Sequence, residues 1–381
     1  TSALEKSAGF FQRIGDDENL GIVANELVNI YKNRTEPEFQ RLRSRIILYS
    51  PTHFDTKNFD DALNQYIDQM VENDSGDNIK EFSFLARAMF QKGRLNDAKS
   101  FLEKSLSALD SHRLEADYSI SVYDYVKIAR VAKDIDKDIF LKVVNNGLKE
   151  FYSIPKSSYE RGLLFDGEMA IELLDLTATL GSRRENISNE IERIMGILHD
   201  TKNVSDAPYV LVDAVELLVK IGRTDRAKGL IKDLHSKNYL RTDDYLNLGQ
   251  ASAIVGDDLG ARNYFNDYIQ YSKDRLSYKS LARSQALAGR YEDSMDSISK
   301  IKEQKEKDQA LYSLTKNTAE NERYVSSFNA AKKIEGPYLR RAWMDIAVNM
   351  YKENRQPTLE NIETLYDLYL KLHVKMIESV N

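Results

Sequence analysis

Glycines at a nearly constant interval constrain the fold of this chain more than any other feature of its sequence. Gly222, Gly256 and Gly289 follow one another at separations of 34 and 33 residues, and each stands between two segments with helical hydrophobic periodicity. Glycine commonly closes a helix, because it adopts the left-handed backbone conformation without steric cost. This interval is typical of helix-turn-helix repeats. The sequence therefore predicts stacked helical hairpins over residues 240–354.

The chain is long enough to hold many such repeats. It has 381 residues, of which 42% are hydrophobic and 30% are charged, so a large buried core is available. No Gly/Ser-rich or Pro-rich run marks a flexible linker. We expect one continuous solenoid, with N-terminal helical hairpins over 1–76, an irregular helical-repeat segment over 77–205, and regular repeats with a C-terminal capping helix over 206–381.

Apolar residues recur every three to four positions along most of the chain, which is the pattern of amphipathic helices. No window of alternating β-branched residues is long enough to predict a strand. The predicted fold class is all-α, an α-solenoid of stacked antiparallel hairpins whose last helix covers the apolar end of the array. In the regular part, we predict helices at 208–221, 224–235, 242–255, 258–272, 276–288, 291–303, 306–319, 323–334, 338–352 and 357–379.

The charge of the chain predicts no nucleic-acid partner, and its hydropathy predicts no membrane-spanning helix. The 54 Lys and Arg residues are balanced by 60 Asp and Glu residues, which gives a net charge of −6. Such a chain has no bulk positive field to attract nucleic acid or an anionic membrane. No segment approaches the roughly 18 to 20 consecutive apolar residues that a membrane-spanning helix needs. We therefore expect no nucleic-acid partner and no membrane span.

The sequence contains few signals for an enzyme or a metal site. The sequence contains no phosphate-binding loop, no dinucleotide-binding glycine pattern and no nucleophile elbow. Carboxylates are spread regularly, as solvated helix faces require. We predict no catalytic residue, no metal and no cofactor. None of the five histidines has metal-ligand spacing, and each is interpreted as structural or surface-exposed: His53, His112, His199, His235 and His373.

The chain contains no cysteine, which excludes disulfides, thiolate zinc sites and cysteine nucleophiles. A cysteine-free chain of this size that begins at Thr1 without Met has the form of a processed, exported bacterial protein, and a cloned fragment would have the same form. We expect a periplasmic or cell-envelope location, with a cytoplasmic location as the alternative.

The repeats share an order of residue types: a bulky aromatic, a leucine three positions later, a small residue, a glycine turn, a second small residue and a second bulky one. This order resembles the tetratricopeptide repeat, although Gln285 stands where that family usually has an aromatic residue. The later copies are more degenerate. The residues that carry the resemblance are Tyr245, Leu248, Gly249, Gly256, Ala261 and Phe265; Tyr278, Leu281, Ala282, Gly289 and Ser294; Phe82, Leu85, Ala86, Gly93, Ala98 and Leu102; Leu311, Leu314, Thr315 and Ser327; and Trp343, Ile346 and Ala347.

In tetratricopeptide arrays, the first helix of each hairpin lines a concave groove. The resemblance places in that groove Leu246, Gln250, Lys279, Arg283, Tyr312, Lys316, Met344 and Val348, with Arg341 nearby. Four of these are basic and would suit an acidic peptide or a polyanion. In a chain that is 30% charged, four basic residues on one face also arise by chance. The predicted partner-binding residues are Gln250, Lys279, Arg283, Tyr312, Lys316 and Arg341.

The function that fits this architecture is a non-catalytic scaffold or adaptor for a protein or peptide partner. One hypothesis is a bacterial cell-envelope assembly for secretion, pili, motility or polysaccharide export. A second is a cytoplasmic peptide-sensing tetratricopeptide regulator, but residues 1–33 lack the pattern of a DNA-binding helix-turn-helix. A third is a glycan-binding or glycan-processing helical-repeat protein, which would need converging acids. The sequence predicts neither the partner nor the oligomeric state.

Overall fold

The computed structural model describes residues 17–34, 36–72, 78–112, 121–153, 160–181, 184–200, 207–236, 240–272 and 276–352. These residues form eighteen α-helices and one short 3-10 helix, with no strand among them. The fold class is all-α, as predicted. None of the described helices is both long and apolar enough to cross a membrane. The predicted helix at 357–379 lies outside the described residues.

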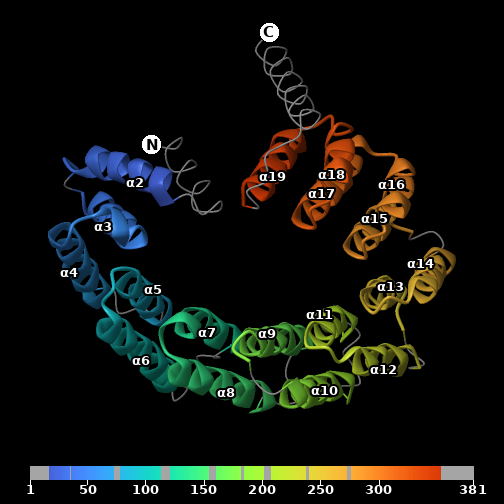
Figure 1. The fold of residues 1–381 in the computed structure, drawn as a ribbon, viewed down its shortest axis with the longest axis horizontal. Helices are drawn as coiled ribbons and strands as arrows, with labels where there is room; N and C mark the ends of the chain where they lie inside the picture. The colour runs from blue at the N-terminus through green and yellow to red at the C-terminus, as the bar shows by residue number, and fades with distance from the viewer. Residues whose placement is uncertain are drawn as a thin grey trace, which may run out of the picture. The chain divides into compact units, whose positions relative to one another are not determined.

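The chain divides into two compact units, Thr1–Val204 and Ser205–Asn381. In the first unit, most helices pack against the next one along the chain, as α5 does against α6 and α7 against α8, and α5, α7 and α9 also contact one another in series (Figure 1). Its elements are α2 (Asp17–Tyr31), α3 (Pro37–Tyr49), η1 (Pro51–His53), α4 (Thr56–Glu72), α5 (Asn78–Gln91), α6 (Leu95–His112), α7 (Val122–Ile135), α8 (Lys137–Ser153), α9 (Glu160–Ala178) and α10 (Arg184–Asp200).

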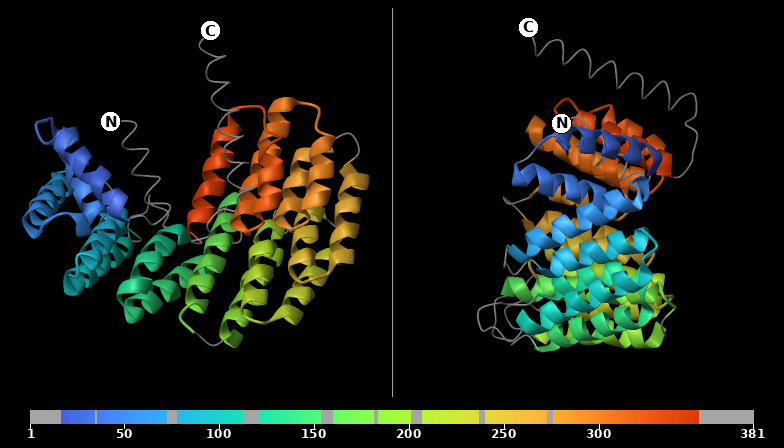
Figure 2. Two further views of the ribbon diagram at one scale, coloured as in Figure 1. Left: turned by 45° about the horizontal axis from the view of Figure 1, so that its top comes forward. Right: turned by 90° about the vertical axis from the view of Figure 1, so that its left-hand side faces the viewer.

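The second unit is the more regular of the two. Its odd-numbered helices contact one another in series and form one layer, while each even-numbered helix packs against the odd-numbered helix that precedes it (Figures 1 and 2). Its helices are α11 (Ala207–Lys220), α12 (Thr224–His235), α13 (Asp244–Ile254), α14 (Asp258–Ser272), α15 (Tyr278–Leu287), α16 (Tyr291–Ser299), α17 (Gln304–Glu320), α18 (Tyr324–Ala331) and α19 (Tyr338–Lys352).

The turns inside the hairpins have the conformation that the glycine spacing predicts. Gly222, Gly256 and Gly289 all have positive φ, between 72° and 78°. After each glycine, the next backbone N–H bonds to a carbonyl five residues earlier, as in the 2.8 Å bond from Arg290 N to Gln285 O. This geometry satisfies carbonyls that the helix end leaves unpaired. The next hairpin has the same turn, with Glu322 at a φ of 59° in place of glycine.

Two of the predicted helices end earlier than expected. The helix predicted at 291–303 ends at Ser299, and the helix predicted at 323–334 ends at Ala331. In each case the chain leaves the helix and still buries an isoleucine beyond it: Ile301 is 8% exposed and Ile334 is fully buried. These residues continue the helical hydrophobic pattern in the sequence, but the turn itself places them in the core.

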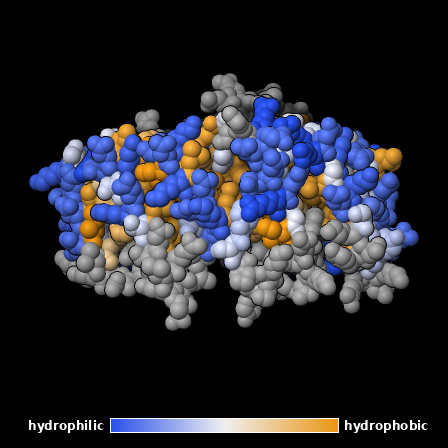
Figure 3. Space-filling view, turned by 90° about the horizontal axis from the view of Figure 1, so that it is seen from below, coloured by the Kyte–Doolittle hydropathy of each residue, from blue (hydrophilic) through white to orange (hydrophobic). Residues whose placement is uncertain are grey.

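Small side chains recur where the two helices of a hairpin meet. The hydroxyl of Ser294 in α16 donates a 2.8 Å hydrogen bond to the Ala282 carbonyl of α15, and Ser327 in α18 donates an equivalent bond to the Thr315 carbonyl of α17. Large apolar side chains fill the space between the layers. The face in Figure 3 is mainly hydrophilic, with separate hydrophobic patches.

Candidate functional site

Eight side chains from three consecutive helices of the odd-numbered layer form the surface that we call the polar strip. Residues three or four positions apart lie on the same side of a helix, so each helix contributes a short row. The helices α15, α17 and α19 contact one another in series, which brings these rows together. The polar strip consists of Lys279 and Arg283 from α15, Gln309, Tyr312 and Lys316 from α17, and Tyr338, Arg341 and Asp345 from α19.

Gln309 connects the three helices of the polar strip. Its Oε1 accepts a hydrogen bond from Nζ of Lys279 in α15. Its Nε2 donates a 2.9 Å bond to the hydroxyl of Tyr338 in α19. One amide side chain therefore fixes the positions of a cation and of an aromatic ring on the two neighbouring helices.

Tyr312 and Tyr338 form the aromatic part of the polar strip. Their ring centroids are 5.6 Å apart with an interplanar angle of 27°, and both side chains are half-buried. The Tyr312 hydroxyl donates a 2.8 Å bond to Oδ2 of Asp345. Burial, followed by this hydrogen bond and the Asp345 charge, raises the pKa of Tyr312 to about 12. Tyr312 therefore stays neutral at physiological pH, and the stacked pair offers a rigid platform with polar edges.

The cations of the polar strip differ in the interactions that they make with neighbouring residues. The Nζ of Lys316 is 3.7 Å from Oε1 of Glu320, but both side chains are about half exposed, so this ion pair is weak. The Arg341 guanidinium lies 6.0 Å from the centroid of the Tyr338 ring. Arg283 is exposed and makes no ion pair with any residue of the described ranges. The arginines can therefore bind a partner's carboxylates.

The predicted residues of α13 do not contribute to this surface. Gln250 is 7% exposed and Leu246 is 6% exposed, so both side chains lie in the packed layer. Lys279, Arg283, Tyr312, Lys316 and Arg341 are the predicted residues that α15, α17 and α19 bring together. The sequence reasoning missed Gln309, Tyr338 and Asp345, although each lies three or four positions from Tyr312 or Arg341 along its own helix.

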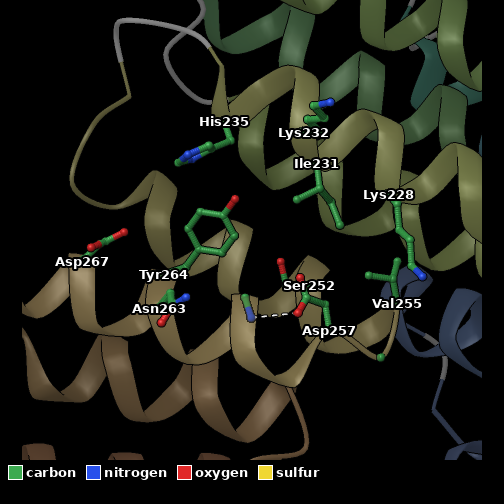
Figure 4. Close-up of a pocket in the computed structure, with 12 residues that line it drawn as sticks. Lys228, Ile231, Lys232, His235, Ser252, Val255, Asp257, Asn263, Tyr264 and Asp267 are labelled. Atoms are coloured by element: carbon green, nitrogen blue, oxygen red, sulfur yellow. Dashed lines mark hydrogen bonds between the residues drawn. The ribbon is translucent and has the colours of Figure 1, made fainter.

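A separate cavity of about 700 Å³ lies between α12 and α14 (Figure 4). Lys228, Lys232 and His235 line it from α12, while Asn263, Tyr264 and Asp267 line it from α14. The His235 ring stands edge-on to Tyr264, with 5.2 Å between centroids. Cations on one wall and two carboxylates opposite them, those of Asp257 and Asp267, do not favour a ligand of either charge.

The described residues contain no cluster of three or more His, Asp or Glu side chains that could hold a metal ion. The polar strip has one carboxylate, that of Asp345, and it accepts the Tyr312 hydroxyl. Its donors and aromatic rings can bind a ligand. They do not form an arrangement of nucleophile and base.

No known protein family matches the sequence, and no curated protein matches it. Among solved structures, Ton1535 from Thermococcus onnurineus NA1 aligns with 89% of this chain and 99% of its own, at 12% identity and a TM-score of 0.33. A Rap protein complexed with competence and sporulation factor aligns over 92% and 100%, at 10% identity and a TM-score of 0.30.

A circular tandem repeat protein with a novel repeat topology aligns with 98% of this chain and 82% of its own, at 14% identity and a TM-score of 0.25. TM-scores this low transfer no function to the chain. The packing of its own helices shows a helical-repeat fold, and the tetratricopeptide family stays a resemblance.

Proposed function

We propose that this protein is a non-catalytic scaffold that binds an acidic segment of a protein partner along the polar strip. The observation that carries the proposal is the hydrogen-bonded path from Lys279 through Gln309 to Tyr338, which links a cation to the stacked Tyr312–Tyr338 pair across three helices. Tyr and Arg are the residue types that most often anchor protein interfaces.

Charge favours an acidic ligand. The polar strip carries four cations, Lys279, Arg283, Lys316 and Arg341, in a chain whose net charge is −6. Among the eight residues of the polar strip the one carboxylate, Asp345, is bonded to a tyrosine, and the neighbouring Glu320 forms only a weak, exposed ion pair with Lys316. Arg–carboxylate hydrogen bonds are charge-assisted and therefore stronger than neutral ones. Electrostatic attraction of this kind also raises the association rate and makes binding depend on salt.

The test is a charge reversal with a matched control. The double variant Lys279→Glu/Arg283→Glu reverses two cations of the polar strip that lie four positions apart. The double variant Lys228→Glu/Lys232→Glu makes the same change in charge, at the same spacing, on exposed residues of α12. Fluorescence anisotropy with a labelled oligoglutamate peptide compares both with the wild type. We expect at least about tenfold weaker binding for the first variant only.

Two results would contradict the proposal. Equal weakening by both double variants would mean that the peptide senses only net charge. An unchanged affinity and salt dependence of Lys279→Glu/Arg283→Glu would exclude the polar strip as the binding surface. Affinity purification of the native partner with the same three proteins extends the comparison to a physiological ligand.

We propose further that the partner belongs to a bacterial cell-envelope assembly, such as one for secretion, pili, motility or polysaccharide export, and that the protein is periplasmic or envelope-associated. A chain without thiols cannot be cross-linked by oxidation, so its composition is compatible with an oxidising compartment such as the periplasm. Cell fractionation tests it, since recovery with the cytoplasmic fraction alone would favour a cytoplasmic peptide-sensing regulator. Turnover of an oligosaccharide by the purified chain would instead favour a glycan-processing protein.

A further inference from the structure

A second cavity lies in the first unit, where α2, α3, η1 and α5 meet. Its volume is about 420 Å³, which is within the range of about 300 to 1,000 Å³ that is usual for small-molecule sites. Its apolar floor includes Leu48 and Ala88, each 1% exposed, and Pro51, which is also buried. This unit contains no residue of the polar strip, so the cavity is independent of the function proposed above.

One wall of this cavity is aromatic. The rings of Tyr49 in α3 and Phe84 in α5 are 5.7 Å apart. Tyr66 in α4 lies against Phe84 at 5.8 Å, and its hydroxyl donates to Glu81. Phe84 is therefore held by neighbouring rings, whereas Tyr49 is 46% exposed. A large exposed aromatic next to an apolar floor provides a surface on which a flat apolar group can stack.

The charge of the cavity is one-sided. Arg87 of α5 and His53 of η1 line it, and none of the described residues that line it is acidic. An anion in the cavity therefore meets the Arg87 guanidinium without an opposing carboxylate among these residues. In this respect the cavity differs from the one between α12 and α14, where acidic and basic side chains share the lining.

The η1 turn, which lines the cavity, is held in place by contacts on two sides. From the turn after α5, Nζ of Lys92 donates to the carbonyls of Pro51 and Phe54, at 3.1 and 2.6 Å. On the other side, the His53 imidazole packs against α2 at Gly21, where an added Cβ would be 2.3 Å from Nδ1. Glycine weakens a helix interior, and here it makes room for the histidine ring. The site is thus pre-formed, which lowers the entropic cost of binding.

We propose that this cavity binds an organic carboxylate with an aromatic body. The ring of the ligand lies between the apolar floor and Tyr49, and its carboxylate accepts hydrogen bonds from the Arg87 guanidinium. A carboxylate matches the planar donor pattern of arginine. The same chemistry is found in a free aromatic acid and in the C-terminal aromatic residue of a peptide. The volume suits either source, and the experiment distinguishes them.

Isothermal titration calorimetry of the full chain with 2-naphthoate and its neutral amide, 2-naphthamide, tests the site. We expect one naphthoate to bind per chain and the amide to bind at least about tenfold more weakly, because it cannot form the charge-assisted bond. Arg87→Gln should lose the preference for the acid, and Tyr49→Ala should weaken both probes. Arg262→Gln, on the exposed surface of α14 in the other unit, serves as the control and should change nothing.

Arg87 and Tyr49 are exposed, so neither variant is expected to unfold the chain, and circular dichroism verifies this. Equal affinities for acid and amide, full binding by Arg87→Gln, or no binding at millimolar probe would each overturn the proposal. A peptide ending in a free C-terminal phenylalanine is compared with its amidated form. Tighter binding of the free form than of naphthoate identifies a chain end as the ligand, and weaker binding identifies a small acid. Both results support the site.

Discussion

Gly249 lies directly against the ring of Phe265. A Cβ added to this glycine would be 2.6 Å from Cε1 of the ring, although real Cβ contacts are essentially never closer than 3.0 Å. Phe265 is 3% exposed and belongs to the core cluster of the hairpin formed by α13 and α14. The small residue and the bulky ring of the repeat pattern are therefore direct contact partners, and the close approach of the two helices depends on the missing Cβ.

Gly249→Ala should destabilise the protein by about 1 to 3 kcal/mol, because the added methyl group overpacks the contact with Phe265. The control is Gly229→Ala in α12, where a Cβ would meet no heavy atom within 4 Å. Alanine is a better helix former, so this variant should gain up to about 1 kcal/mol. Urea unfolding monitored by circular dichroism measures both. Equal effects would mean that backbone entropy, not packing, decides at Gly249.

Glu322 should be improved by glycine. It has a φ of 59° at the turn position where the preceding hairpins have glycine, and L-residues adopt this conformation at a cost of roughly 1 to 2 kcal/mol. Glu322→Gly should therefore raise the free energy of unfolding by up to about 1 kcal/mol. Gly289→Ala, with a φ of 72° before substitution, should lower it by a similar amount. Loss of stability in Glu322→Gly would show that contacts of the glutamate side chain outweigh the strain.

Gln309→Leu tests whether the amide organises the polar strip. The variant keeps the size of the side chain but removes both hydrogen bonds, to Lys279 and to Tyr338. We expect binding of the oligoglutamate peptide to weaken about threefold to tenfold while the unfolding midpoint changes little, because these bonds are only partly buried. Surface plasmon resonance separates the two rates. A faster dissociation is expected, whereas unchanged kinetics would limit Gln309 to a structural role.

The hydroxyl of Tyr312 should ionise only at an unusually high pH. Its pKa is raised from 10.0 to about 12, first by burial and then by Asp345. Between these values the unfolded state loses the proton and the folded state keeps it. The contribution to stability is therefore fully present below pH 10 and is lost as the pH rises through about 12. Subtracting the near-ultraviolet tyrosinate titration of Tyr312→Phe from that of the wild type isolates the signal of this hydroxyl. Asp345→Asn should lower the pKa of Tyr312, but not all the way to 10.0, because burial remains.

The hairpins were predictable because their signals are local. A glycine closes a helix through its own backbone conformation, and the apolar period of a helix is visible within a few turns of sequence. The apolar period also predicted two helices that are too long, because Ile301 and Ile334 continue the period but lie beyond the helix ends. An isoleucine in periodic register is equally buried by a helix or by the turn that follows it, and only the packed structure distinguishes the two.

The polar strip was predictable in part. The resemblance placed Lys279, Arg283 and Tyr312 on one surface, because helical spacing and a repeat register determine which residues share a face. It also placed Gln250 there, but that side chain is 7% exposed. Exposure depends on how closely the next hairpin packs, and a repeat pattern does not contain that distance.

The sequence alone thus determined an all-α chain of hairpins with glycine turns and an acidic net charge. The tertiary structure decided which residues some thirty positions apart meet: Gln309 with Tyr338, Phe84 with Tyr49, and His53 with Gly21. The physical reason is the range of the forces. Backbone geometry and hydrophobic period act within one helix, whereas these contacts depend on the rotation and spacing of neighbouring helices, which the packing of the whole array sets.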